Sequence, residues 1–366
     1  MNLVSPSTYH LNCDDPLQFI YLSPEKKPIR TDIDDKAPEF IGLSSDLDMI
    51  KLPFAFTGGN VISDGQESAF STCVILNENL YDGETEEKFL SDTKKLLGIN
   101  QYNIISNFEA NGIQHIDCFM KMLDEERLFV IRPPEDHPSF HIYEDIVTNE
   151  LSKLRNAYGR PYQILRLDTD RFRGDELAAY SNSLILNKTV YVPLFGIKQD
   201  SVALAQWAAA MPGYKIKGFN YVIRKEPSVS DDARTHYGNN IGWTGGDALH
   251  CRTIAMWDSQ MLYMSVDRIP TYVQPENEYP VYVIIKDYSM KGLMNDNLKL
   301  SWRTKGSSWN QIQLQPSGHT DIYKASIPGM ATGTTVEYFI SAKDKSGRSE
   351  TMPRTAPEGV YVFSVL

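Results

Sequence analysis

The sequence predicts an α/β protein made of repeated strand and helix modules, followed by a smaller all-β domain. Between residues 40 and 270, a turn, a β-rich segment, a charged loop and a helical segment recur at intervals of roughly 55 to 70 residues, which suits one strand-hairpin-helix unit. The turns at 57–60 and 244–247, Thr-Gly-Gly followed by Asn or Asp, are the closest internal match. After residue 270 short alternating strands replace this pattern, as is typical of an all-β domain.

Four modules can be placed in order along the first 270 residues. β-rich residues follow a turn in each module, which predicts strands at 69–76, at 112–122 with 127–131, at 183–186 with 189–194, and at 252–257 with 261–266. In the first three modules, helical spacing or an alanine-rich run then predicts helices at 86–97, after Pro138, and at 201–211. The residues Asn187 and Lys188 mark the turn of a hairpin in the third module.

Each such module would bury one face of its sheet, and modules arranged around an axis would cover one another. The repeats therefore predict a pseudosymmetric α/β propeller. The alternative is an ordinary α/β sheet whose loops resemble each other by chance.

The residues after 275 predict a separate domain. Period-two alternation gives six strands, spaced about 8 to 14 residues apart and separated by glycine-containing turns, as in a small β-sandwich of the immunoglobulin type. These strands are expected at 281–285, 298–303, 309–314, 322–327, 336–342 and 360–365. We expect domains at 1–275 and 276–366.

Composition narrows the function classes. The chain has 366 residues and a formal net charge of −11, from 36 basic and 47 acidic side chains. Nucleic acid normally requires a basic footprint, so we expect no nucleic-acid partner, and a cationic ligand fits the charge better. No apolar run reaches the roughly 18 residues of a spanning helix, so no membrane span is expected. The first residues show no signal peptide, so the protein is made without one or the numbered chain begins after it.

Several familiar sites are missing from the sequence. The four cysteines never form CxxC, and HExxH, GxSxG, the phosphate loop and GxGxxG do not occur. We therefore expect neither a metal nor a cofactor.

Two constellations remain that could carry chemistry. His115 and Asp117 lie two residues apart, on one face if this segment is a strand, and a carboxylate beside an imidazole can orient a cation and keep the histidine protonated. Cys251 follows a glycine-rich turn, where a backbone in a tight conformation can present a nucleophile to a ligand. His250 is expected to point to the opposite face from Cys251 and to be structural.

These motifs, together with 57–60, Asp64-Gly65 and the run 181–187, resemble those of the bacterial peptidylarginine deiminases of the Porphyromonas type, which are related to agmatine deiminases. The resemblance covers roughly residues 30 to 350 by motif comparison. It implies a pentein-like fold, a five-module α/β propeller, with an appended immunoglobulin-like β-sandwich. The first module is incomplete by comparison.

The resemblance also implies a reaction and its residues. The Cys251 thiolate would attack a guanidinium carbon, His115 would act as general acid and base, and Asp117 would bind the guanidinium. Asn182 would lie near the cysteine or the substrate. The products would be peptidylcitrulline and ammonia, and Asn60 falls among the substrate-binding residues.

The sequence departs from the family pattern at the substrate end of the site. The family pattern includes a second carboxylate that binds the guanidinium, and this sequence has no exact counterpart of its motif. Asp14 or Asp15 is the expected substitute. Arg30 falls between the positions of two arginines expected to bind a peptide carboxylate. The expected partner is therefore an arginine-containing peptide or protein, or else agmatine or another small guanidino compound, and an inactive relative that only binds such ligands is a further alternative. Relatives of this type are often exported, so we expect an extracellular or cell-surface protein; the sequence does not predict its oligomeric state.

Overall fold

The computed structural model describes two units of the chain. The residues described are 41–44, 52–55, 58–80, 85–109, 114–220, 243, 248–253 and 258–366. Internal contacts separate an N-terminal unit, Met1–Ala210 with Lys215–Met256, from a C-terminal unit, Met211–Tyr214 with Trp257–Leu366. The boundary expected at residue 275 therefore lies inside the C-terminal unit.

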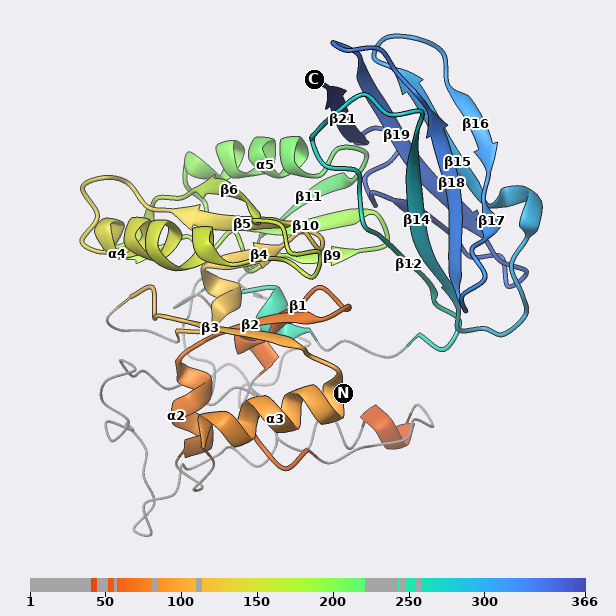
Figure 1. Cartoon of the computed structure of the whole chain (residues 1–366). Coiled ribbons are helices and arrows are strands. Elements are labelled where there is room, and N and C mark those ends of the chain that lie inside the picture. The colour runs from red at the N-terminus through yellow and green to blue at the C-terminus, as the bar shows by residue number, and fades with distance from the viewer. Residues whose placement is uncertain are drawn as a thin grey trace, which may run out of the picture. The chain divides into compact units, whose positions relative to one another are not determined.

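Three small sheets of the N-terminal unit share one topology (Figure 1). In each, a first strand pairs antiparallel with a second, and the second pairs parallel with a third. The sheets consist of β1 (Ile62–Ser63), β2 (Ser68–Thr72) and β3 (Gln101–Ile105); of β4 (Met120–Met122), β5 (Arg127–Arg132) and β6 (Gln163–Asp168); and of β9 (Leu184–Leu186), β10 (Thr189–Leu194) and β11 (Lys215–Asn220).

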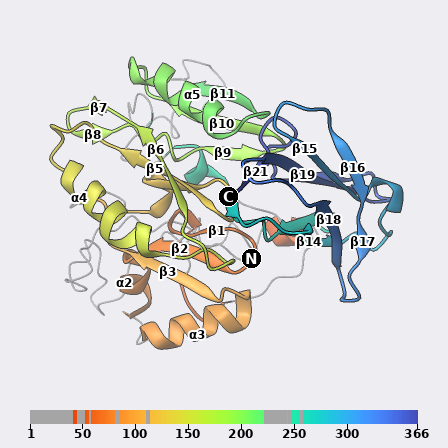
Figure 2. The same ribbon diagram turned by 45° about the horizontal axis from the view of Figure 1, so that its top comes forward.

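Helical segments join the second and third strand of each sheet, as parallel pairing requires. They are α2 (Val74–Leu80) with α3 (Glu86–Leu97); α4 (Phe140–Asp145) continued by η3 (Ile146–Glu150) and η4 (Leu151–Lys153); and α5 (Gln199–Ala210). Both ribbon views show α5 lying along β10 and β11 (Figures 1 and 2). The three repeated modules confirm the predicted α/β character. A short hairpin, β7 (Arg171–Arg173) and β8 (Glu176–Leu177), completes the strands of this unit described by the structure.

Local sequence explains where these elements begin and end. Thr85 caps α3 because its side chain accepts a hydrogen bond from the Lys88 backbone, and two glutamates occupy the first turn. Gly98 ends the helix at φ 72°, a conformation that favours glycine. Asn187 and Lys188, at φ 47° and 58°, form the tight turn predicted between β9 and β10.

The fourth module is not formed as predicted. Its expected strand at 261–266 is β12 (Leu262–Val266), but β12 pairs antiparallel with β14 (Glu278–Asp287) in the C-terminal unit. The apolar residues of β12 enter the core of that unit, which is the physical reason for the earlier boundary. The expected strand at 252–257 overlaps the short helix η5 (His250–Arg252), and its residues 254–257 lie outside those described.

The C-terminal unit is a two-sheet β-sandwich around one apolar core. The first sheet has the order β12-β14-β18-β17, and the second has the order β13-β21-β19-β15-β16 with β20 paired to β19. The remaining strands are β13 (Tyr272–Val273), β15 (Lys299–Thr304), β16 (Asn310–Gln313), β17 (Gln315–Pro316), β18 (Ile322–Pro328), β19 (Thr335–Lys343), β20 (Ser349–Met352) and β21 (Tyr361–Val365). Alternate residues of β19 are buried, as the period-two pattern predicted. All six predicted strands are present, while the immunoglobulin-type assignment stays a prediction.

The N-terminal unit packs its helices onto its sheets through apolar and aromatic side chains. Phe89 of α3 contacts Phe54 and Tyr102 edge to face, and Trp207 of α5 packs against Phe129 of β5. None of the helices within the described ranges is both long and apolar enough to cross a bilayer.

Candidate active site

Three short turns of the N-terminal unit carry the predicted site residues. They are the 3₁₀ helices η1 (Gly58–Asn60), η2 (Ile116–Cys118) and η5. A fourth segment, the turn containing Asn182, directly precedes β9. These segments are separated by up to about 190 residues of sequence, and hydrogen bonds tie them together.

Cys251 lies where these turns converge. The side-chain amide of Asn182 donates a hydrogen bond to Cys251 Sγ at 2.9 Å. The Asn182 side-chain oxygen accepts hydrogen bonds from the backbone N–H of His250 at 2.8 Å and of Cys251 at 3.3 Å. Asn182 is fully buried, so it both fixes the η5 turn and contacts the sulfur.

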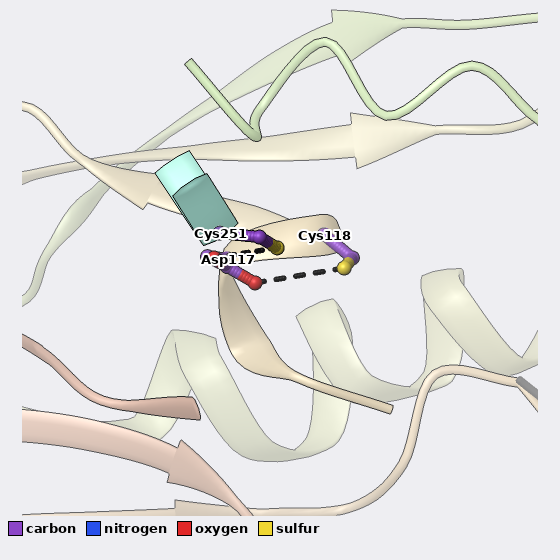
Figure 3. A group of neighbouring side chains, drawn as sticks. All are labelled: Asp117, Cys118 and Cys251. Carbon is purple, nitrogen blue, oxygen red and sulfur yellow. Dashed lines mark hydrogen bonds between the residues drawn. The ribbon is translucent and has the colours of Figure 1, made fainter. Parts of the chain in front are cut away.

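Asp117 is the charged centre of the cluster and is fully buried. Its Oδ2 atom accepts hydrogen bonds from His250 Nδ1 at 2.7 Å and from Cys251 Sγ at 3.4 Å, and its Oδ1 atom accepts one from Cys118 Sγ at 3.5 Å. Figure 3 shows both cysteine sulfurs next to this carboxylate, with a dashed line joining Asp117 to each of them. Burial alone would raise the pKa of Asp117, but the hydrogen bond from His250 and nearby positive charge outweigh it and hold the pKa below its usual value.

His115 directly precedes η2 and is also fully buried. Its charge contributes to the lowered pKa of Asp117, so the two predicted partners do act on each other. Their proximity arises differently from the prediction, however. Residues 116–118 form a 3₁₀ turn rather than a strand, and Gln114 enters that turn at φ 54°.

Gly59 lets the η1 backbone approach this pair closely. A Cβ atom at residue 59 would lie 2.8 Å from His115 Nδ1, closer than real Cβ contacts allow, and 3.1 Å from Asp117 Oδ2, which is a tight contact. The glycine-rich motif at 57–60 therefore has a steric function, because it leaves room for the imidazole and the carboxylate.

His250 lies on the same side as Cys251, so the expectation that it points to the opposite face is wrong. Consecutive side chains diverge by about 180° in a strand but by about 120° in a 3₁₀ turn, and η5 is such a turn. His250 can therefore reach Asp117 while Cys251 contacts the same carboxylate.

Asn60 has its side chain engaged by the protein. Its Oδ1 atom accepts hydrogen bonds from the backbone and hydroxyl of Thr72 and from the backbone of Ile116, at 2.9–3.1 Å, and its amide donates to the Thr72 carbonyl. Asn60 thus fastens the end of β2 to η2. The structure gives Asn60 a positioning task, and the substrate contact expected from sequence stays a prediction.

Two further residues beside the site were missed by sequence reasoning. Cys118, buried next to Asp117, has its pKa raised well above the usual value by a hydrogen bond with Cys251, by burial and by the nearby negative charge. Lys121 on β4 is 6 % exposed, and its Nζ atom has no hydrogen-bond partner within the described ranges. Burial lowers the pKa of Lys121 to about 8, although Asp117 and Cys251 oppose that shift. The signal available was a lysine within the apolar run Phe119–Met122.

The three remaining predicted residues, Asp14, Asp15 and Arg30, lie outside the described residues, so the second guanidinium carboxylate stays a prediction. The structure does bring together Cys251, Asp117 and Asn182, with His115 acting on Asp117. A thiol, a buried anion and an amide donor at one point can bind a planar cation and attack it.

Comparison with known proteins gives relatives named for guanidino chemistry. A candidate agmatine deiminase of Mycoplasma capricolum is 24 % identical over 218 residues, covering 51 % of this chain and 58 % of the relative. One of Lactococcus lactis is 27 % identical over 198 residues, covering 46 % and 53 %. The chain thus spans little more than half the length of these relatives.

A solved structure agrees in fold. The crystal structure of a candidate peptidyl-arginine deiminase matches with a TM-score of 0.50 at 18 % identity, covering 63 % of this chain and 66 % of the other. The family model of the Porphyromonas-type peptidyl-arginine deiminases matches residues 8–223, more than half of the chain, and includes the segments of Asn60, His115, Asp117 and Asn182. The chain therefore belongs to the Porphyromonas-type peptidyl-arginine deiminase family.

Proposed function

We propose that this protein hydrolyses a guanidino group to a ureido group and ammonia, with Cys251 as the nucleophile. The observation that carries the proposal is the position of Cys251 Sγ, 2.9 Å from the Asn182 amide and 3.4 Å from the Asp117 carboxylate. Membership of the deiminase family and the names of the agmatine deiminase relatives support it.

Asp117 would bind the substrate cation. Its lowered pKa keeps it anionic at neutral pH, and a carboxylate matches the planar donor fork of a guanidinium. The contact with Cys251 places a bound guanidinium carbon beside the sulfur. His250 holds one oxygen of Asp117 and so orients the carboxylate.

The covalent step would proceed in two halves. The Cys251 thiolate adds to the guanidinium carbon, and the tetrahedral adduct expels ammonia with a proton supplied by His115, which leaves an S-alkylthiouronium. Water then gives a proton to His115 and adds to the same carbon. The second adduct collapses to the ureido product and returns the thiolate. A thiolate needs nearby positive charge, which Lys121 supplies within the buried site.

The substrate class we propose is peptidyl-arginine, with peptidylcitrulline as the product, because the matching family is named for that activity. A second candidate is agmatine or another free guanidino compound, favoured by the names of the relatives. Ammonia and ureido formation measured side by side on an arginine-containing peptide and on agmatine distinguishes the two. The substrate with the higher kcat/KM is the preferred one.

The nucleophile is tested with Cys251→Ala and Cys251→Ser. We expect both to release no ammonia above background while remaining folded by circular dichroism, since neither side chain supplies a thiolate. Asp175→Asn, which alters an exposed carboxylate of the same unit, is the matched control and should keep full activity. Ammonia release by Cys251→Ala at the parent rate would overturn the enzymatic proposal and leave an inactive guanidino-binding relative.

We also propose that the N-terminal unit completes a five-module propeller, that the C-terminal sandwich is of the immunoglobulin type, and that the protein acts outside the cell or at its surface. Three repeated modules and a two-sheet sandwich support the first two points. The third is supported by family resemblance alone. An experimental structure of the full chain tests the fold, and fractionation of the producing cells followed by immunodetection tests the compartment.

A further inference from the structure

Two thiols, rather than one, surround the candidate catalytic carboxylate. Cys118 Sγ donates to one oxygen of Asp117 and Cys251 Sγ donates to the other, as Figure 3 shows. The ligating atoms of these three residues all lie within 4.8 Å of one another. The proposed deiminase reaction uses only one of the two sulfurs, so Cys118 has no part in it.

We propose that Cys118, Cys251 and Asp117 form a binding site for one thiophilic divalent cation of the Zn²⁺ type, which blocks the nucleophile reversibly. On binding, two S–H protons pass to solvent and two sulfur–metal bonds form, so one divalent cation replaces two protons. The inhibition part of this inference rests on the proposed function, whereas the binding of the metal does not.

The donor set determines which cation fits. Cysteine thiolates select Zn²⁺ and other soft ions, while Mg²⁺ and Ca²⁺ prefer oxygen donors. Zn–S bonds of about 2.3 Å in a tetrahedral site place ligand atoms roughly 3.3 to 3.8 Å apart. The thiol-to-carboxylate distances here are 3.4 Å to Oδ2 and 3.5 Å to Oδ1, and the three ligand atoms lie within 4.8 Å of one another, so they must approach by up to about 1 Å on binding.

A neighbouring positive charge balances the net charge of the metal site. Two thiolates and a carboxylate around a divalent cation leave one net negative charge, and the buried Lys121 ammonium, which acts on both Asp117 and Cys251, offsets it. His250 Nδ1 donates to Asp117 Oδ2 at 2.7 Å and would orient the ligating carboxylate.

Direct metal binding tests the inference without any substrate. The reduced, metal-free full chain is titrated with Co²⁺ and then with Zn²⁺ against a chromogenic chelator. We expect one equivalent bound, with a sulfur-to-cobalt charge-transfer band in the near ultraviolet that Zn²⁺ removes. Cys118→Ser should weaken Zn²⁺ binding about a hundredfold or more and diminish the band. Loss of a residue that only hydrogen-bonds to a metal ligand already lowers metal affinity about 10- to 100-fold, and Cys118 is itself a ligand. Asp175→Asn should bind as the parent does, since its carboxylate is exposed and outside the cluster.

Two results would overturn the metal site. They are a parent protein with no charge-transfer band, and a Cys118→Ser variant, folded by circular dichroism, that binds Zn²⁺ as tightly as the parent. Cys118→Ala gives the same test should serine disturb the turn. Ammonia release is then followed with added Zn²⁺: the parent should be inhibited and recover with chelator, while the residual activity of Cys118→Ser should be insensitive. Binding of one Zn²⁺ by a parent that has no deiminase activity would uphold the site and reject the proposed function.

Discussion

The two units of the chain bury different kinds of side chain. The core cluster of the C-terminal unit draws apolar and tyrosine side chains from both of its sheets, and the charged side chain buried among its described residues is Asp344, whose Oδ1 atom accepts backbone hydrogen bonds from Ser346 and Arg348. The N-terminal unit instead buries Asp117, His115 and Lys121 at one place, beside the thiols of Cys118 and Cys251. Buried charge normally costs stability unless it is paired, so this cost is concentrated at one cluster in the N-terminal unit, whereas the sandwich buries a single carboxylate in a turn among its described residues.

This difference separates the roles of the two units. In the sandwich, burial follows strand alternation, and substitutions should change stability without changing the chemistry. In the site cluster, each buried polar group holds another one in place, and substitutions should change activity more than stability. The predictions below test this separation, from the largest expected effect to the smallest.

Asp117→Asn should give the largest change. An amide cannot bind the guanidinium as an anion or hold His250 in the same way, so kcat/KM should fall about a thousandfold, or about 4 kcal/mol in activation free energy. Because the pKa of Asp117 is lowered in the folded state, the ionised carboxylate stabilises the fold at pH values above its usual pKa. That stabilisation is lost as the pH falls through the folded-state pKa. Urea unfolding at several pH values should show that the free energy of unfolding falls less toward acid pH in the variant than in the parent. Activity within tenfold of the parent would contradict the assignment.

Leu300→Ala should affect stability alone. Leu300 lies on β15 and is fully buried in the sandwich core, so its truncation should cost about 3 kcal/mol in unfolding free energy of the C-terminal unit. The ammonia-release rate per folded molecule should not change. A fall in kcat measured well below the unfolding transition would show that the two units are functionally coupled and would break the comparison.

Lys121→Met should make the protein more stable and less active. The pKa of Lys121 is lowered from 10.5 to about 8, so charging it in the folded state is costly below pH 8, and that cost disappears as the pH rises from 8 to 10.5. We expect the variant to gain about 2 kcal/mol at neutral pH, less than the full linkage value because the surroundings relax.

The Lys121→Met difference should vanish toward pH 10.5. The alkylation rate of Cys251 by iodoacetamide, followed against pH, should shift to higher pH in the variant because the thiolate loses a neighbouring cation. Lys121→Arg, which keeps the charge, serves as the matched control. An unchanged alkylation profile in Lys121→Met would remove Lys121 from the electrostatics of the site.

The same contrast explains how much the sequence could predict. Strands β15 and β19 lie within one residue of the predicted 298–303 and 336–342, and α3 has the predicted bounds, because their periodicity matches their burial. The sequence places the boundary near 275 rather than near 256 because the residues of β12 alone do not indicate which unit the strand joins. Only its antiparallel partner β14 decides between them, and that pairing is a tertiary fact.

The sequence predicted the site residues that lie in recognisable motifs. It did not predict the residues whose part in the site depends on how their side chains are oriented. Short sequence motifs identified Cys251, Asp117 and Asn182 as site residues, and the structure brings them together. His250 was assigned to the wrong face because sequence cannot distinguish a 3₁₀ turn from a strand start after a glycine-rich turn. Lys121 was missed because its burial depends on how β4 packs rather than on its neighbours in sequence.

Gly59→Ala should show the smallest effect that still separates activity from stability. The new methyl group would overlap His115 Nδ1 and the Asp117 carboxylate, and a shift of these groups should lower kcat/KM about tenfold, with about 1 kcal/mol or less lost from unfolding. Gly159→Ala is the matched control: φ is 74° there with open space around it, so the variant should lose about 1 kcal/mol of stability and no activity. Should both variants lose activity equally, the close approach of η1 to the site would have no catalytic importance.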